Sequence, residues 1–128
     1  MKTVDEYMDI AHASDLKWRK ALEFYKDEIA HMLNMLSEVS QKNTSSEVRM
    51  MVSHFESQFT INKEVIAELK HEINLREDFI ASDLKKNVVA YEHRIIHTHM
   101  DMKGRMLVFE KLFTELKKQF NRFLSEIM

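Results

Sequence analysis

Apolar residues recur at alternating steps of four and three along three long segments of the chain. The first series is Val4, Met8, Ala11, Asp15, Trp18, Leu22, Tyr25, Ile29, Met32, Leu36 and Val39. The second series is Val48, Val52, Phe55, Phe59, Asn62, Ile66, Leu69, Ile73, Arg76 and Ile80. The third series is Leu84, Val88, Tyr91, Ile95, His99, Met102, Met106, Phe109, Phe113, Leu116, Phe120, Phe123 and Ile127. Residues three and four apart share one face of an α-helix, so each series predicts a long amphipathic helix.

Polar residues mark where these helices begin and end. Thr3 and Glu6 have capping-box spacing at the start of the first helix. In the polar stretch after Gln41, we expect Asn43 to end that helix in the left-handed conformation. Thr44 is then expected to cap the second helix, with Glu47 as its capping-box partner.

The second break is less distinct and is expected within residues 82–87, where Ser82 or Asp83 can supply the cap. The sequence therefore predicts one all-α domain, residues 1–128. Its three long antiparallel helices, about 3–42, 44–83 and 85–128, form an up-down-up, coiled-coil-like bundle. An extra step of four before His99 and the nearby Gly104 leave one alternative, four helices with a break near Gly104.

The two turns also predict which residues lie side by side. Turns centred near residues 43 and 85 place residue 15 level with about residue 71, and residue 71 level with about residue 99. The same register places Phe55 and Phe59 beside an aromatic part of the third helix that contains Phe109, Leu112, Phe113 and Leu116.

Composition supports few, long helices and excludes several functions. The chain has no proline and one glycine, so it is poor in turn-forming residues. It has no cysteine, which excludes disulfides, thiolate metal sites and a cysteine nucleophile. Its net charge is −2, and even residues 83–128 have only nine basic side chains against six acidic ones, so we expect no nucleic-acid binding. No apolar run is long enough to span a membrane and no secretory signal begins the sequence, which predicts a cytoplasmic protein.

Histidines occur in two patterns that metal sites use. Glu-x-x-His, at Glu28/His31 and Glu68/His71, resembles the di-iron carboxylate motif of ferritin-like four-helix bundles, which implies inward metal ligands. On a helical wheel, however, both histidines lie away from the apolar faces, which predicts that they face solvent or a partner.

The second pattern is His93 and His97, four residues apart, with Asp101 one turn further on. Side chains at this spacing can hold a divalent ion. These histidines also point away from the apolar face, so we expect a solvated polar surface.

Polar residues within the apolar series are more informative. They are Asp15, Asn62, Arg76 and His99. The predicted register puts Asp15 and His99 in one layer, and we interpret them as a buried Asp–His pair that fixes how the helices align. Two alternatives are a wrong register, in which the residues do not meet, and a metal or small-ligand site. That site would hold a divalent transition metal through His12, Asp15, Glu72 and His99.

No catalytic arrangement is present in the sequence. One glycine cannot build a phosphate-binding loop, and no strand-turn-helix context exists for a nucleophile elbow. A second apolar stripe, Val89, Ile96, Met100 and Leu107, lies off the main face of the third helix. It predicts self-association or contact with a partner helix. The sequence thus predicts a non-enzymatic helical scaffold or protein–protein interaction module, with the metal- or ligand-binding bundle as its alternative.

Overall fold

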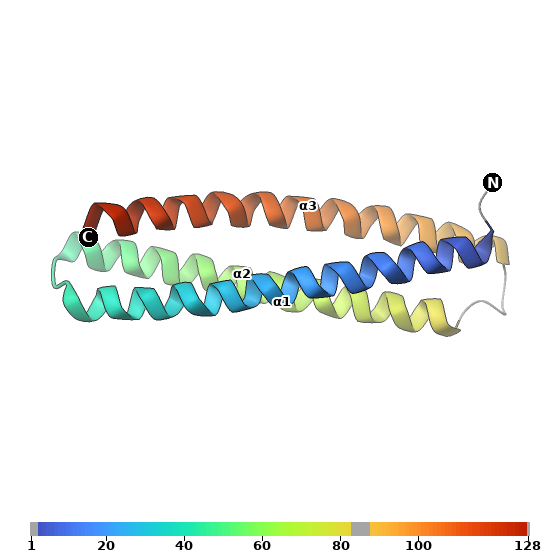
Figure 1. Cartoon of the computed structure of the whole chain (residues 1–128), viewed down its shortest axis with the longest axis horizontal. Coiled ribbons are helices and arrows are strands. Elements are labelled where there is room, and N and C mark those ends of the chain that lie inside the picture. The colour runs from blue at the N-terminus through green and yellow to red at the C-terminus, as the bar shows by residue number, and fades with distance from the viewer. Residues whose placement is uncertain (1–2, 83–87, 128) are drawn as a thin grey trace.

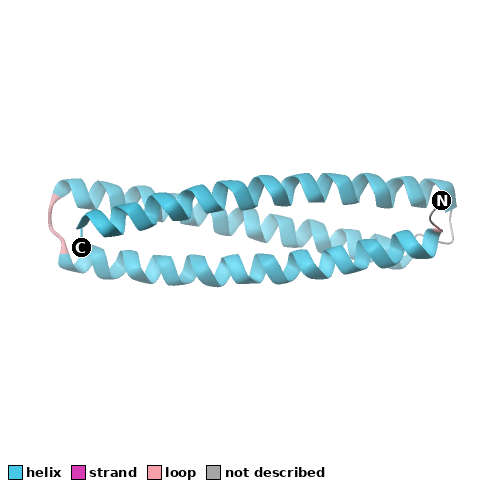
Figure 2. Cartoon of the chain, turned by 45° about the horizontal axis from the view of Figure 1, so that its top comes forward, coloured by secondary structure: helices cyan, strands magenta, loops and turns pink. Residues whose placement is uncertain are grey.

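Three long helices account for nearly all of the chain in the computed structural model, which describes residues 3–82 and 88–127. They are α1 (Val4–Lys42), α2 (Ser46–Ser82) and α3 (Val88–Ile127). Figure 1 shows an elongated bundle in which α1 and α3 run in the same direction and α2 runs in the opposite one. Figure 2 shows a single short loop joining α1 to α2. The predicted three-helix, up-down-up fold is confirmed.

Contacts between α1 and α2 show their antiparallel alignment residue by residue. His12 pairs with Glu77, Arg19 bonds to Asn74 and Glu23 pairs with Lys70, so numbers rise on one helix as they fall on the other.

The start of α1 follows the predicted capping chemistry. The Thr3 hydroxyl accepts from the Glu6 amide at 3.2 Å, and the Glu6 carboxylate accepts from the Thr3 amide at 3.2 Å. This reciprocal pair is the capping box, which satisfies two amides that have no partner inside the helix.

The turn between α1 and α2 differs from the prediction in two ways. Asn43 does not enter the left-handed region, since its φ is −124°; its side-chain amide instead donates to the carbonyl of Val39 at 3.0 Å. Ser45, not Thr44, caps α2, because the Ser45 hydroxyl accepts from the Val48 amide at 3.2 Å. Thr44, Ser45 and Ser46 are all residue types that can cap a helix, so the sequence alone does not show at which of them α2 begins.

The end of α2 and the course of α3 are also defined. The predicted cap Ser82 is the last residue of α2, whereas the predicted cap Asp83 and the predicted start of the third helix at residue 85 lie within residues 83–87, outside the described residues. The Tyr91 hydroxyl donates to the carbonyl of Ile80 at 2.6 Å, satisfying an acceptor in the last turn of α2. α3 is continuous through Gly104, so the four-helix alternative is wrong. One glycine lowers helix stability by about 1 kcal/mol relative to alanine, which is too little to break a helix whose residues before and after it are packed in the core.

The apolar core is divided into two clusters. The larger extends over most of the bundle, and its most enclosed part is aromatic: Phe55 packs on Phe120 and Phe123, and Phe59 packs on Phe120. The smaller cluster consists of Ala11, Phe79, Ile80, Tyr91 and Ile95, where α1 begins and α2 ends. Between these two clusters lies a layer of polar side chains.

The aromatic contacts correct the predicted register. Phe55 and Phe59 meet residues 120 and 123 rather than the predicted Phe109–Leu116 region, which packs instead against Tyr25 of α1. Side chains tilt toward the N-terminus of their own helix. In an antiparallel pair the two tilts are opposite, so the side chains that touch belong to residues with higher numbers than the residues whose backbones lie level. Turn positions alone omit this displacement.

Candidate functional site

The polar layer between the two clusters is built around a buried ion pair. Asp15 comes from α1 and Arg76 from α2, and both are buried, with relative exposures of 0% and 5%. Arg76 Nε lies 3.4 Å from Asp15 Oδ2. Each residue occupies a position of its helix's apolar series, so the helical period that buries the core also buries these charges.

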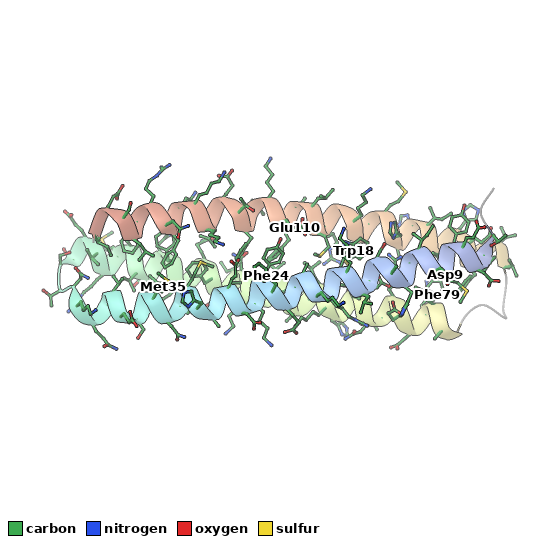
Figure 3. The ribbon with its side chains drawn as sticks, viewed as in Figure 1. Asp9, Trp18, Phe24, Met35, Phe79 and Glu110 are labelled. Atoms are coloured by element: carbon green, nitrogen blue, oxygen red, sulfur yellow. The ribbon has the colours of Figure 1, made fainter. Side chains whose placement is uncertain are left out.

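α3 contributes His99 to the same layer. Arg76 Nη2 donates to His99 Nδ1 at 3.2 Å, and since the guanidinium has no acceptor, the neutral ring must hold its proton on Nε2. The His99 ring also packs on Trp18 at 5.3 Å between centroids, and Arg76 Cζ lies 5.7 Å from the centre of the Trp18 ring. Figure 3 shows Trp18 in the space between α1 and α3. The layer therefore joins all three helices.

The side chains of the polar layer contact one another, but their hydrogen bonding is incomplete. The 3.4 Å ion-pair distance exceeds the roughly 2.7–2.9 Å of a charge-assisted hydrogen bond. Among the described residues, both carboxylate oxygens of Asp15 and Arg76 Nε and Nη1 are buried without an aligned hydrogen-bond partner. Such groups carry a desolvation cost, so the pair specifies alignment rather than adding much stability.

Burial also changes the protonation of the layer. The pKa of Asp15 is raised from 3.8 to about 7, first by burial and then by the neighbouring Glu77 carboxyl, while Arg76 and Arg19 only partly oppose the rise. Burial lowers the pKa of Arg76 as well, with Asp15 acting in the opposite direction. An arginine still remains cationic at neutral pH. The pKa of about 7 means that the charge of Asp15 changes near neutral pH.

The structure brings together only part of the predicted site. Asp15 and His99 share a layer as expected, but Arg76 lies between them as the common partner. His12 is exposed and pairs with Glu77 at 3.1 Å rather than approaching Glu72, which is half-buried and makes no hydrogen bond or ion pair to the other three residues. Within residues 3–82 and 88–127, no three His, Asp or Glu side chains converge as metal ligands would. The metal site of His12, Asp15, Glu72 and His99 stays a prediction of the sequence.

Sequence reasoning singled out Arg76 as a polar residue on an apolar face but missed its role. The predicted register placed residue 71 opposite Asp15, and the structure places Arg76 there, which is five residues, more than one turn, further along. A lone buried cation opposite a lone buried anion is the signal that could have corrected the register, since buried charges are paired. Glu77, which pairs with His12, carried no such signal.

The remaining histidine motifs lie on the surface. His31 and His71 of the Glu-x-x-His motifs are exposed, as are His93, His97 and Asp101. The prediction that they face away from the core is confirmed.

A pocket of about 330 Å³ lies between α1 and α3, beside the buried layer. Trp18 and His99 line it, together with Lys17, Lys103 and Glu110. Trp18 and His99 also contact Arg76, so the pocket adjoins the buried layer.

A larger groove of about 880 Å³ lies between α2 and α3. Ile61 and Val65 of α2 and Val108 and Leu112 of α3 form its apolar surface, and Asp101 is one of the charged residues at its edge. Ile61, Val108 and Leu112 are 50%, 60% and 61% exposed. Exposed apolar side chains gathered on one side of a bundle are compatible with contact to a partner.

These features define the class of protein as an antiparallel three-helix bundle with a buried polar layer and an open apolar groove. Comparison of the chain with protein-family models, with curated proteins and with solved structures finds no match. None of the described helices is long and apolar enough to cross a membrane. The cytoplasmic location stays a prediction of the sequence.

Proposed function

We propose that this chain is a non-enzymatic helical interaction module that binds a partner helix in the groove between α2 and α3. The observation that carries the proposal is the exposed apolar surface of Ile61, Val108 and Leu112 in that groove. A groove between two antiparallel helices is the usual receptor for the apolar face of a third helix, which contributes residues at i, i+3, i+4 and i+7.

The buried ion-pair layer supports a scaffold role. Asp15, Arg76 and His99 fix the alignment of the three helices, and a fixed alignment keeps the groove residues of α2 and α3 opposite one another. The predicted stripe of Val89, Ile96, Met100 and Leu107 is exposed as well; Met100 lines the groove, whereas Leu107 lines the pocket between α1 and α3.

A peptide titration tests the proposal. The probe is a synthetic amphipathic helix of leucine, alanine and lysine, whose lysines suit the acidic residues Asp101 and Glu115 in the groove. With dye-labelled chain at nanomolar concentration, we expect saturable one-to-one binding by fluorescence anisotropy. Val108→Gln with Leu112→Gln should weaken it by about tenfold or more, since each buried aliphatic side chain contributes about 1.5–3 kcal/mol.

Leu16→Gln with Phe24→Gln provides the matched control, because these residues are similarly exposed but lie on α1. Glutamine preserves helix propensity at all four positions. Absence of saturable binding, or equal weakening by the two double variants, would reject the groove as a binding site.

A further inference from the structure

Exposed residues of α3 form a second periodic series, on the side of the helix that faces away from the core. His97, Asp101, Gly104, Val108, Lys111 and Glu115 recur at alternating steps of four and three, and all six are exposed. We call this set the outer seam of α3. Such spacing places residues along one line of a helix, as the contact line of a coiled coil requires.

The order of residues in the outer seam is self-complementary about the level of Met106. Moving outward from that level, Val108 stands opposite Gly104, Lys111 opposite Asp101, and Glu115 opposite His97. In an antiparallel pair of identical helices related by a twofold axis, residue i meets residue j and j meets i. Each charged residue of the seam then meets a group that attracts it.

The charges of the seam are available for this pairing. Asp101, Lys111 and Glu115 form no ion pair or side-chain hydrogen bond with any other part of the chain that the structure describes. A parallel arrangement would instead set Asp101 against Asp101 and Lys111 against Lys111, which repel. The charge pattern therefore favours one orientation of one partner.

Gly104 lies near the centre of the seam, and no packing contact among the described residues requires a glycine there. A Cβ added to Gly104 would meet no atom within 4 Å, and its backbone is helical. Glycine there costs about 1 kcal/mol relative to alanine. In the antiparallel pair the partner's Val108 packs over Gly104, where the missing side chain allows close approach of the two helices.

Apolar residues border the seam on both sides. Met100 and Leu107, 67% and 59% exposed, lie on one side, and Leu112 lies on the other, next to Ile61 of α2 in the groove. From His97 to Glu115 the seam is about 27 Å long at 1.5 Å per residue. Burial of these flanking residues supplies the hydrophobic stabilisation that the charged seam lacks.

We infer that the partner in the groove is a second copy of this chain, docked antiparallel through α3 in a twofold dimer. This inference rests on the proposed interaction role and names its partner. Two helices from each copy, α2 and α3, then form the walls of the interface, and the groove of each copy is closed by the other.

Charge reversal and its rescue test the inference. By sedimentation equilibrium at micromolar concentrations, we expect the wild-type chain to be dimeric. Asp101→Lys places two lysines together at each end of the seam and Lys111→Asp places two aspartates together, so each variant should dimerise at least about tenfold more weakly. Combining both substitutions in one chain, or mixing the two single variants in equal amounts, should restore the dimer.

Asp9→Lys and Lys20→Asp are the matched controls, since both residues are exposed on α1 and should leave dimerisation unchanged. A strictly monomeric wild-type chain, or a dimer that the single reversals do not weaken, overturns the inference. A monomer that still binds the peptide in its groove overturns the dimer alone, whereas a chain that does neither overturns the proposed function too.

Discussion

Asp15 and Arg76 illustrate how a buried charge is tolerated in this bundle. Each alone would be very costly in the core, and together they remain in contact at 3.4 Å with several polar atoms unsatisfied. A pair of this kind stabilises little relative to apolar residues of similar size, but removing one partner leaves an uncompensated charge.

A double-mutant cycle measures this asymmetry. Arg76→Met should lower the free energy of unfolding at pH 9 by about 2–3 kcal/mol, because two units above the Asp15 pKa of about 7 the wild-type carboxyl is charged and the variant lacks its cation. Asp15→Leu combined with Arg76→Met should bring the free energy of unfolding back to within about 1–2 kcal/mol of wild type, or above it. Urea unfolding at pH 9 checks both values, and a double variant as unstable as the sum of the single ones contradicts this account of the layer.

The raised pKa of Asp15 also predicts a pH dependence. Between 3.8 and about 7 the folded protein keeps a proton that the unfolded chain has released. The stability contributed by Asp15 is therefore fully present below the unfolded pKa and is lost as pH rises toward 7. Urea unfolding at pH 5 and pH 8 should show that wild type loses more stability over this interval than Asp15→Asn.

That comparison isolates Asp15 because wild type and Asp15→Asn share the other titratable and charged groups around it. These groups are His12 and Arg19 of α1, Arg76 and Glu77 of α2, and His99 of α3. Parallel pH profiles for wild type and Asp15→Asn would contradict the raised pKa.

Side-chain hydrogen bonds satisfy backbone groups at several ends of the helices. The Thr3–Glu6 capping box starts α1, Ser45 starts α2 and the Tyr91 hydroxyl satisfies the carbonyl of Ile80 near the end of α2. Each bond satisfies a backbone group that the helix itself leaves without a partner. The starts of α1 and α2 are thus set locally, the end of α2 is satisfied by a side chain of α3, and the long interiors of the helices depend on packing.

The cap of α2 offers a direct comparison of adjacent residues. Ser45→Ala removes the hydroxyl that accepts from the Val48 amide and should lower the free energy of unfolding by about 0.5–2 kcal/mol. Thr44→Ala should change it by less than about 0.5 kcal/mol, because Thr44 makes no such bond. Thermal or urea unfolding of the two variants checks the assignment, and a larger loss at Thr44 would return the cap to that residue.

Across the whole bundle, the polar layer divides the core into unequal parts. The larger cluster includes most of the buried aromatic and aliphatic residues, while the smaller one at the other side of Asp15 and Arg76 has five buried members among the residues that the structure describes. A region with few buried apolar contacts opens at lower free energy than the rest of the molecule.

Amide hydrogen exchange should therefore separate the two parts. We expect amides near Ala11, Phe79 and Ile95 to exchange through local opening, and those near Leu36, Phe59 and Phe120 to exchange only with global unfolding. Mass spectrometry of exchange at several urea concentrations distinguishes these regimes. Equal protection on both sides of the layer would show that Asp15 and Arg76 do not divide the bundle.

The helices, their exposed faces and the capping box of α1 were predictable from the sequence because they depend on neighbours three and four residues away. That information is present in Thr3 and Glu6, in the periodic apolar series, and in the outward placement of His31, His71 and the stripe that contains Met100 and Leu107. No long-range contact is needed to infer them.

The partners across the bundle required the folded structure. A periodic apolar face stays buried when a helix slides by about one turn, so the pattern does not distinguish Arg76 from Glu72 as the residue opposite Asp15. The choice depends on the geometry of the turn at Ser45 and on the tilt of side chains along each helix. The pKa of Asp15 follows from that choice, because its burial and its neighbours exist only once the three helices have packed together.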